Sequence, residues 1–126
     1  MCLALIVRLP LASGLLAGKF KKDTHFAAND HRNYNANGEK FNVGETFAGL
    51  PFETGVELAE EIRPLVSPEI SMAEFAVRWI LDFDAVTTVI PGATRVAQAQ
   101  TNARPSDLPR LPEDVHRRLR DLYDTR

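Results

Sequence analysis

A turn between a strand and a helix carries the sharpest chemical signal in this sequence. Residues 90–95 read Ile-Pro-Gly-Ala-Thr-Arg and lead into a helix that carries Gln98 and Asn102. The free amides and the positive dipole end of such a helix favour a phosphate group, and Arg95 could add a charge-assisted hydrogen bond. Gln98 and Asn102 are four residues apart, so they share one helix face and could both meet an adenosine. The alternative is a Pro-Gly turn before a polar surface helix, and the residues alone leave both interpretations open.

A second glycine-containing turn, residues 10–19, follows the first apolar run of the chain. Gly14 and Gly18 are separated by three residues rather than the four of a P-loop, and Phe20 stands where Ser or Thr would bind magnesium. This pattern excludes a P-loop nucleotidase. The backbone N–H groups of the turn could still bind an anion, and a simple tight turn is an equal alternative.

The remaining residues with chemical potential point to no catalytic site. His25 and His31 lie in a polar stretch without a third metal ligand at a suitable spacing. Ser13 lacks the G-x-S-x-G context of a nucleophile, and we expect His116 to lie on the surface of a basic helix. No pair of carboxylates stands out for acid–base work. We therefore assign no catalytic residue and no metal ligand, and the chain offers binding without catalysis.

Composition narrows the class of protein. The chain has 126 residues, with 15 Lys and Arg against 17 Asp and Glu, a net charge of −2 and 44% hydrophobic residues. These values exclude a strongly basic nucleic-acid binder and argue against disorder. Cys2 is the only cysteine, so a disulfide framework is impossible. No apolar run approaches the roughly 20 residues of a membrane span. We expect a cytoplasmic protein that binds neither nucleic acid nor membrane.

Two runs, residues 3–9 and 85–90, are predicted to be strands. The first is almost continuously apolar, which is typical of a parallel strand covered on both faces, and the second is rich in Val and Thr. Between them, residues 20–51 are rich in Asn, Asp, Gly and Lys and show no helical or strand periodicity. A loop of this length is more often a lid or a binding loop than a plain connection. Its apolar anchors would be Phe26, Tyr34, Phe41, Val43, Phe47 and Leu50.

Helices are predicted after this loop. The first begins near Thr54 and is limited by Pro64; Ser71 and Glu74 then form a capping box. Short helices follow at 95–103 and after Pro112, the last with Arg117, Arg118 and Arg120 facing solvent. The residues expected to face the core are Leu58, Ile62 and Leu65 in the first helix, Met72, Phe75, Ala76, Trp79, Ile80 and Phe83 in the second, and Val115, Leu119 and Leu122 in the last.

This order of elements predicts an α/β fold, rich in helix, with repeated βα units. Two strands alone do not make a stable parallel sheet, so the chain looks like a fragment. Alternatively, its strand edges join another copy, or the strands fail to form a sheet.

Several segments together resemble the C-terminal portion of aldo-keto reductases. Residues 7–19, VRLPLASGLLAGK, are similar to the seventh barrel strand and the loop behind it. Residues 41–52, FNVGETFAGLPF, are similar to a loop of one bacterial branch of the family. Residues 75–81, FAVRWIL, and 89–93, VIPGA, are similar to the helix before the last strand and to that strand's end.

The resemblance implies the last two strands of a (β/α)8 TIM barrel that binds NADPH. Residues 1–19 would form a strand and the pyrophosphate loop, 20–53 the long loop, and 54–126 the helices, the last strand and the adenosine-binding turn. The resemblance places Leu11, Ala12, Ser13, Gly14 and Leu15 at the pyrophosphate. It places Gly92, Ala93, Thr94 and Arg95 around the 2′-phosphate, and Gln98 and Asn102 near the adenine and its ribose.

Two departures from the family matter. Many relatives carry a lysine where Gly92 stands, so the preference for NADPH would rest largely on Arg95. The family's catalytic Asp, Tyr, Lys and His belong to its early strands, which have no counterpart here. The resemblance thus implies the C-terminal cofactor-binding part of an NADP(H)-dependent reductase of aldehydes or ketones, inactive alone. The alternative is an ancillary binding module of the same fold, with self-association through exposed strand faces.

Overall fold

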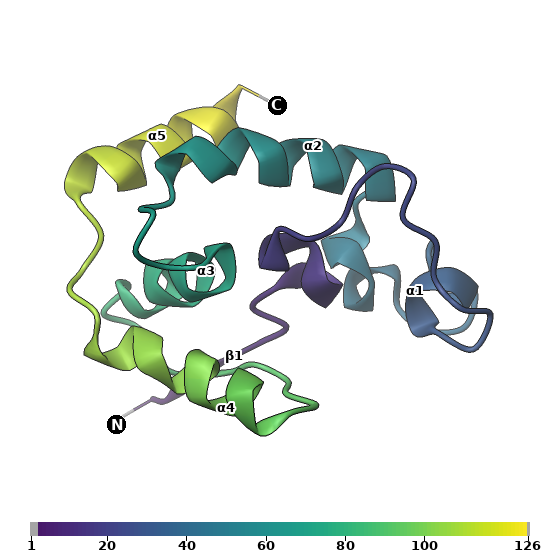
Figure 1. Ribbon diagram of the computed structural model, residues 1–126, viewed down its shortest axis with the longest axis horizontal. Coiled ribbons are helices and arrows are strands. Elements are labelled where there is room, and N and C mark those ends of the chain that lie inside the picture. The colour runs from purple at the N-terminus through teal and green to yellow at the C-terminus, as the bar shows by residue number, and fades with distance from the viewer. Residues whose placement is uncertain (1–2, 126) are drawn as a thin grey trace. The chain divides into compact units, whose positions relative to one another are not determined.

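The computed structural model describes residues 3–125 and divides them between two compact units (Figure 1). The sheet unit contains residues up to Pro10 and from Leu65 onward, and the loop unit contains Leu11–Pro64. Met1 and Cys2, the first two positions of the predicted 1–19 segment, lie outside the described residues. Each unit is described by itself.

The sheet unit is built on two parallel strands, β1 (Leu5–Arg8) and β2 (Val86–Ile90). Ile6 pairs with Thr88 and Arg8 with Ile90, with an irregularity after Leu5. The parallel pairing predicted from the sequence is confirmed. The burial of both faces predicted for the first strand is wrong for the described residues, because the exposed fractions are 49% for Leu5 and 56% for Ile6, and Ile90 of β2 is 54% exposed. The sheet formed by the described residues has only these two strands, so no neighbouring strand covers their edges.

Helix α3 (Met72–Leu81) begins at the predicted capping box. The Glu74 amide donates to Ser71 Oγ at 3.2 Å, and the Ser71 amide donates to Glu74 Oε2 at 2.7 Å. Met72, Phe75 and Ala76 are buried, as the periodicity predicts. Trp79 and Ile80 are only half-buried and Phe83 is 43% exposed. The burial ends within the last turn of the helix, so the apolar pattern extends past the packed surface.

The last helices are α4 (Val96–Ala103) and α5 (Glu113–Asp124). Val115, Leu119 and Leu122 are half-buried, and Arg117, Arg118 and Arg120 are exposed as predicted.

His116 is not the surface residue that its basic helix suggested. Its Nε2 lies 2.8 Å from Asp82 Oδ2, and the two side chains are 15% and 4% exposed. Asp82 also accepts hydrogen bonds from Arg78 Nε at 3.0 Å and from the Leu111 amide at 3.0 Å. The His116 ring stacks with the Trp79 ring at 6.5 Å between centroids. Asp82 therefore ties the segment before α5, and α5 itself, to the end of α3.

The loop unit is more ordered than its composition suggests (Figure 1). Short helical turns interrupt the predicted loop: η1 (Ala12–Ala17), α1 (His31–Tyr34), η2 (Val43–Glu45) and η3 (Phe47–Gly49). The following helix α2 (Phe52–Ile62) starts two residues earlier than predicted, and a 3-10 turn η4 (Arg63–Leu65) takes the chain through Pro64. The side chains of Asp30 and Asn42 cap α1 and η2. Turns this short carry no helical periodicity, which is why the sequence pattern did not reveal them.

A cluster of phenylalanine rings forms the core of the loop unit. Phe20, Phe26 and Phe52 pack against the buried residues Leu15, Phe47 and Val56. The rings of Phe47 and Phe52 lie 5.0 Å apart between centroids, and those of Phe20 and Phe26 lie 5.2 Å apart at 86°, an edge-to-face contact. Of the predicted anchors, only Phe26 and Phe47 belong to this core. The others are exposed: Tyr34, Phe41, Val43 and Leu50.

Helix α2 packs through small residues rather than through its large apolar ones. Gly55, Val56 and Ala59 are buried, whereas the predicted stripe of Leu58, Ile62 and Leu65 is only half-buried. A Cβ atom on Gly55 would lie 2.5 Å from Leu15 Cδ1. The missing side chain lets the helix approach η1 closely, which a count of large apolar residues does not reveal.

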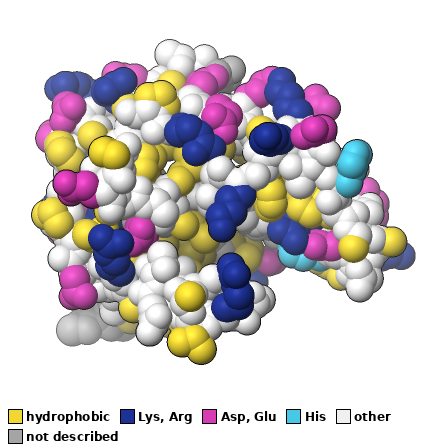
Figure 2. Space-filling model, in the orientation of Figure 1, with side chains coloured by type: hydrophobic (Ala, Val, Ile, Leu, Met, Phe, Trp, Pro, Cys, Tyr) yellow, Lys and Arg dark blue, Asp and Glu magenta, His cyan; other side chains and the backbone are white. Residues whose placement is uncertain are grey.

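Basic and acidic side chains are interspersed over the face seen in Figure 2, in keeping with the near-neutral net charge. None of the helices formed by residues 3–125 combines the length and the hydropathy that crossing a membrane requires.

The Asp82 cluster yields a test of stability. Asp82→Ala is expected to lower the free energy of unfolding by roughly 3–5 kcal/mol, because it leaves the Arg78 guanidinium buried without its carboxylate. Asp84→Ala is the matched control: Asp84 pairs with Arg110, but its side chain is 91% exposed, and such pairs contribute about 0–1 kcal/mol. Denaturant unfolding measures both, and equal losses would contradict the role given to Asp82.

Candidate functional site

The predicted site residues form two groups, one in each unit. Leu11–Leu15, here named the Leu11 turn, belongs to the loop unit. Gly92–Arg95 with Gln98 and Asn102, here named the Gly92 turn, belongs to the sheet unit. In the sequence, each turn shortly follows the carboxyl end of one of the two strands.

The backbone of the Leu11 turn is strained. The φ angles of Ala12, Ser13 and Gly14 are 47°, 58° and 99°. The left-handed region costs a residue with a side chain roughly 1–2 kcal/mol, and such residues persist only where the surrounding structure holds them. They gather at ligand-binding segments. The positive φ angles therefore show that the surrounding structure holds this turn in its shape.

The hydroxyl of Ser13 fastens this turn to a second strained segment. Ser13 Oγ donates to the Glu45 carbonyl at 3.1 Å and accepts from the Phe47 amide at 3.3 Å. Phe47 and Ala48 have φ angles of 50° and 55°. Phe47 is 1% exposed in the aromatic core, so the anchor of the turn is itself rigidly packed. The Ser13 side chain thus holds the turn, and its hydroxyl is engaged within the protein.

Backbone amides of the Leu11 turn remain available. The Gly14 and Leu16 amides both donate to the Leu11 carbonyl, at 2.9 and 3.1 Å. The amides of Ala12 and Ser13 donate no hydrogen bond to another residue of the described part of the chain. Consecutive amides next to left-handed backbone form the type of concave donor group that binds anions. These amides can donate hydrogen bonds to a phosphate oxygen.

The structure adds a cation that the sequence did not reveal. A Cβ on Gly14 would lie 3.7 Å from Arg32 Nη1 and 3.0 Å from the Phe20 ring. Arg32 donates to Asp30 through Nε at 2.9 Å and through Nη2 at 2.5 Å. Its guanidinium carbon lies 4.5 Å from the centre of the Phe26 ring. No periodicity or motif links positions 14 and 32, so only the folded loop brings them together.

The Gly92 turn is held by the two side chains predicted to share a helix face. Thr94 donates through its amide and its hydroxyl to Gln98 Oε1, at 2.8 and 2.9 Å. Asn102 Nδ2 donates to the Gly92 carbonyl at 3.1 Å. The predicted common face of Gln98 and Asn102 is confirmed. In this structure one polar atom of each side chain is used to fix the turn.

Arg95 is the charged residue of this turn. It is the N-terminal cap of α4, with extended backbone at φ −142° and ψ 150°. Its side chain is exposed and makes no ion pair or hydrogen bond with the rest of the described chain. Nothing lies within 4 Å of the position that a Gly92 Cβ would take. The turn thus presents a cation beside open space.

Neither histidine of the loop unit belongs to a metal cluster. His25 is exposed, and His31 Nδ1 lies 3.6 Å from Asp30 Oδ1. Within residues 3–125, no group of three or more His, Cys, Asp or Glu side chains could hold a metal ion.

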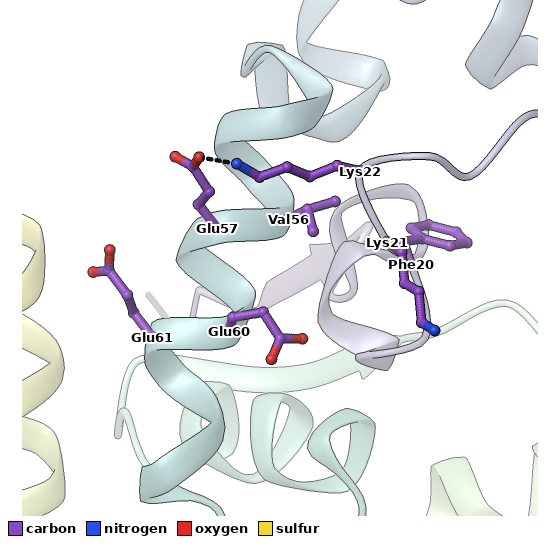
Figure 3. A pocket seen from close by; sticks show the side chains of 7 residues that line it. All are labelled: Phe20, Lys21, Lys22, Val56, Glu57, Glu60 and Glu61. Carbon is purple, nitrogen blue, oxygen red and sulfur yellow. Dashed lines mark hydrogen bonds and ion pairs between the residues drawn. The ribbon is translucent and has the colours of Figure 1, made fainter.

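A shallow hollow of about 570 Å³ lies elsewhere in the loop unit (Figure 3). Glu57, Glu60 and Glu61 come to it from α2, and Lys22 pairs with Glu57. The hollow contains none of the predicted site residues. The Lys22 ammonium group that lines the hollow already pairs with Glu57, so we do not assign the hollow to the site.

Comparisons with known proteins agree with the resemblance. The sequence profile of the aldo/keto reductase family matches residues 3–124. A protein of Arabidopsis thaliana described as a probable voltage-gated potassium channel subunit beta is 31% identical over 104 residues. The match covers 79% of this chain and 28% of that relative. The chain therefore corresponds to little more than a quarter of the relative's length.

The two turns differ in how they tolerate a side chain at glycine. Gly14→Ala is expected to lower the free energy of unfolding by about 1–2 kcal/mol, because φ is 99° and the new methyl group would press on the Phe20 ring. Gly92→Ala, the matched control, should change it by less than about 0.5 kcal/mol, since its surroundings are empty. Thermal unfolding of the two variants measures this, and an equal effect would contradict the strain assigned to the Leu11 turn.

The pair of Asp30 and Arg32 predicts a pH dependence. The hydrogen bond from Arg32 lowers the pKa of the Asp30 carboxyl from 3.8 to about 2. Because the folded pKa lies below the unfolded one, the stabilisation is present above about pH 4 and is lost as the pH falls toward about 2. After allowance for solvent screening we expect about 1 kcal/mol. Asp30→Asn should remove this part of the acid sensitivity, and an unchanged pH profile of unfolding would contradict it.

Proposed function

Because the chain belongs to the aldo/keto reductase family, we propose that it forms the part of an NADP(H)-dependent oxidoreductase that holds the phosphates and the adenosine of the cofactor. The whole protein would reduce aldehydes or ketones, and this chain would be its C-terminal segment. The observation that carries the proposal is the Leu11 turn. Its strained backbone presents free amides beside the Arg32 guanidinium, in a family whose members use nicotinamide cofactors.

The chemistry of the Leu11 turn fits a pyrophosphate. The Ala12 and Ser13 amides would donate to phosphate oxygens, and Arg32 would supply positive charge through Nη1, the guanidinium nitrogen for which the structure records no partner. Ser13 would act as a positioning residue, because its hydroxyl holds the turn against Glu45 and Phe47. When bound, NADPH supplies the hydride for the reduction.

The Gly92 turn fits the adenosine end. Arg95 would contact the 2′-phosphate, a role that its exposed guanidinium can take without breaking an ion pair with any described residue. Gln98 and Asn102 would contribute the polar atoms that the turn leaves free, Nε2 and Oδ1. Gly92 provides open space where many relatives carry lysine, so discrimination between NADPH and NADH would depend on Arg95.

The exposed strands support the proposal that further barrel strands complete the fold. Leu5, Ile6 and Ile90 have the apolar character of a buried sheet, yet about half of each side chain is exposed. Sheets of the barrel type have no free edge, and the chain corresponds to only 28% of its relative. Residues outside the described chain would therefore supply the catalytic groups, and the chain alone would be inactive.

A second candidate follows from the relative's description. That protein is named as a subunit of a channel, so a binding module that assembles with another protein is an alternative for this chain. The exposed faces of β1 and β2 would then meet a partner or a second copy. A monodisperse monomer in light scattering would count against self-association.

Replacement of Arg95 tests the proposed cofactor site. Arg95→Ala is expected to weaken NADPH binding about tenfold to a hundredfold, the value of one charge-assisted hydrogen bond, and to leave NADH binding unchanged. Arg117→Ala is the control, because Arg117 is an exposed arginine on α5 outside both turns. Calorimetric titration of the unchanged chain and of the two variants with NADPH and with NADH measures these affinities. Equal weakening of both nucleotides would contradict the 2′-phosphate contact.

An activity assay tests the absence of catalysis. The 126-residue chain, supplied with NADPH and a reactive aldehyde, should show no oxidation of NADPH above the uncatalysed background. A chain that binds nucleotide and is inactive agrees with the proposal. Turnover that follows the concentration of the chain would show that its own residues complete a catalytic site.

A further inference from the structure

The loop between α1 and η2 contains a chemically labile pair of residues. Asn37 precedes Gly38 in this loop, and its side chain is exposed. We propose that Asn37 is a site of spontaneous deamidation, and that the conversion breaks the hydrogen bond that ties the Asn37 side chain to Glu39 within the turn of residues 37–39. The inference concerns the loop unit alone and does not depend on the proposed function.

The reaction needs only groups that the chain and water supply. The backbone nitrogen of Gly38 attacks Cγ of Asn37 and forms a five-membered succinimide, while the side-chain amide leaves as ammonia with the proton. Water then opens the ring at either carbonyl and leaves aspartate or isoaspartate. No oxidant or reductant takes part. Gly38 has no side chain to shield its nitrogen. That nitrogen donates to the Asn35 carbonyl at 3.2 Å, so this long hydrogen bond must break before the attack.

None of the other asparagines, Asn29, Asn33, Asn35, Asn42 and Asn102, precedes a glycine, and Asn35 and Asn102 are in addition held by the fold. Asn35 is fully buried, donates to Thr46 Oγ1 at 3.1 Å, and accepts from the amides of Lys40 and Phe41 at 2.8 Å each. Asn102 lies within α4 and donates to the Gly92 carbonyl. Both precede alanine, whose methyl group hinders the attack. Exposure and a following glycine coincide at Asn37.

Glu39 holds Asn37 in place before the reaction. Its carboxylate accepts from the Asn37 amide at 2.9 Å and from Asn37 Nδ2 at 3.0 Å. These bonds lower the pKa of the Glu39 carboxyl, so it is ionised at neutral pH. The carboxylate thus restrains the side chain that must rotate toward the Gly38 nitrogen, and it sets the rate at which the reaction starts.

The conversion turns this attraction into repulsion. Deamidation replaces the Nδ2 donor by a carboxylate that faces the carboxylate of Glu39. The isoaspartate form also lengthens the backbone next to Gly38, where a Cβ would already lie 2.9 Å from Val43 Cβ. The crowded turn cannot absorb the extra backbone atom. The turn at residues 37–39 therefore opens after the reaction, while the hydrogen bonds of Asn35 still join the ends of the loop.

Peptide mapping by mass spectrometry tests the site. The full chain is incubated at mildly alkaline pH and sampled over time. We expect conversion of amide to acid, with isoaspartate, at Asn37 several times faster than at Asn35 or Asn102 in the same sample. Asn37→Gln should abolish the signal at this position. Conversion at equal rates in the three peptides, or at Asn37 only in denatured chain, would overturn the assignment.

Two further comparisons test the role of Glu39 and the opening of the turn. Glu39→Ala should speed the conversion of Asn37 several-fold, whereas Glu69→Ala, an exposed glutamate of the sheet unit, should leave the rate unchanged. Asn37→Asp should be cut by protease within residues 35–46 several times faster than Asn37→Gln. An unchanged rate in Glu39→Ala overturns the restraint by Glu39, and equal cleavage of the two Asn37 variants overturns the opening.

Discussion

The structure of the loop unit depends on one hydroxyl group. Ser13 Oγ joins the Leu11 turn to the segment around Phe47, and both segments have left-handed backbone at residues other than glycine. Such backbone does not persist unless its surroundings hold it. The packing of Phe47 against Phe52 and Phe26 gives the Ser13 hydroxyl a fixed place to bind. The aromatic core therefore stabilises an unfavourable turn, and that turn is the part of the unit at which we propose an anion site.

The two turns also differ from other parts of the described chain in how their arginines are paired with carboxylates. Several arginines of the described chain pair with a carboxylate, as Arg78 does with Asp82 at the end of the same helix and Arg104 with Glu74 on another element. Arg32 also has a partner, Asp30, but that pair uses Nε and Nη2 and leaves Nη1 toward Gly14. Exposure alone does not distinguish Arg95 from the arginines of α5. Its position at the start of a helix, beside the space above Gly92, does.

Local patterns predicted what local interactions determine. The capping box at Ser71, the parallel pairing of the two strands and the common face of Gln98 and Asn102 all depend on residues close in sequence or on strand character. The approach of Arg32 to Gly14 and the burial of His116 against Asp82 depend on how the chain folds back on itself. No spacing rule reveals these contacts, which is why the cation of the Leu11 turn and the anchor of α5 were missed.

The strands show the opposite case: their apolar residues predict burial by neighbouring strands, and the described residues form no such neighbours. A residue such as Ile6 gains roughly 1.5–3 kcal/mol when it is fully buried, yet more than half of its side chain is exposed here. Apolar edges left open also invite pairing with other chains. The apolar pattern of β1 and β2 is therefore evidence for neighbouring strands, and the family match over residues 3–124 indicates what kind of sheet they complete. In such barrels the loops after the strands form the binding site. Each of the two candidate turns of this chain follows a strand, as a segment of such a barrel should.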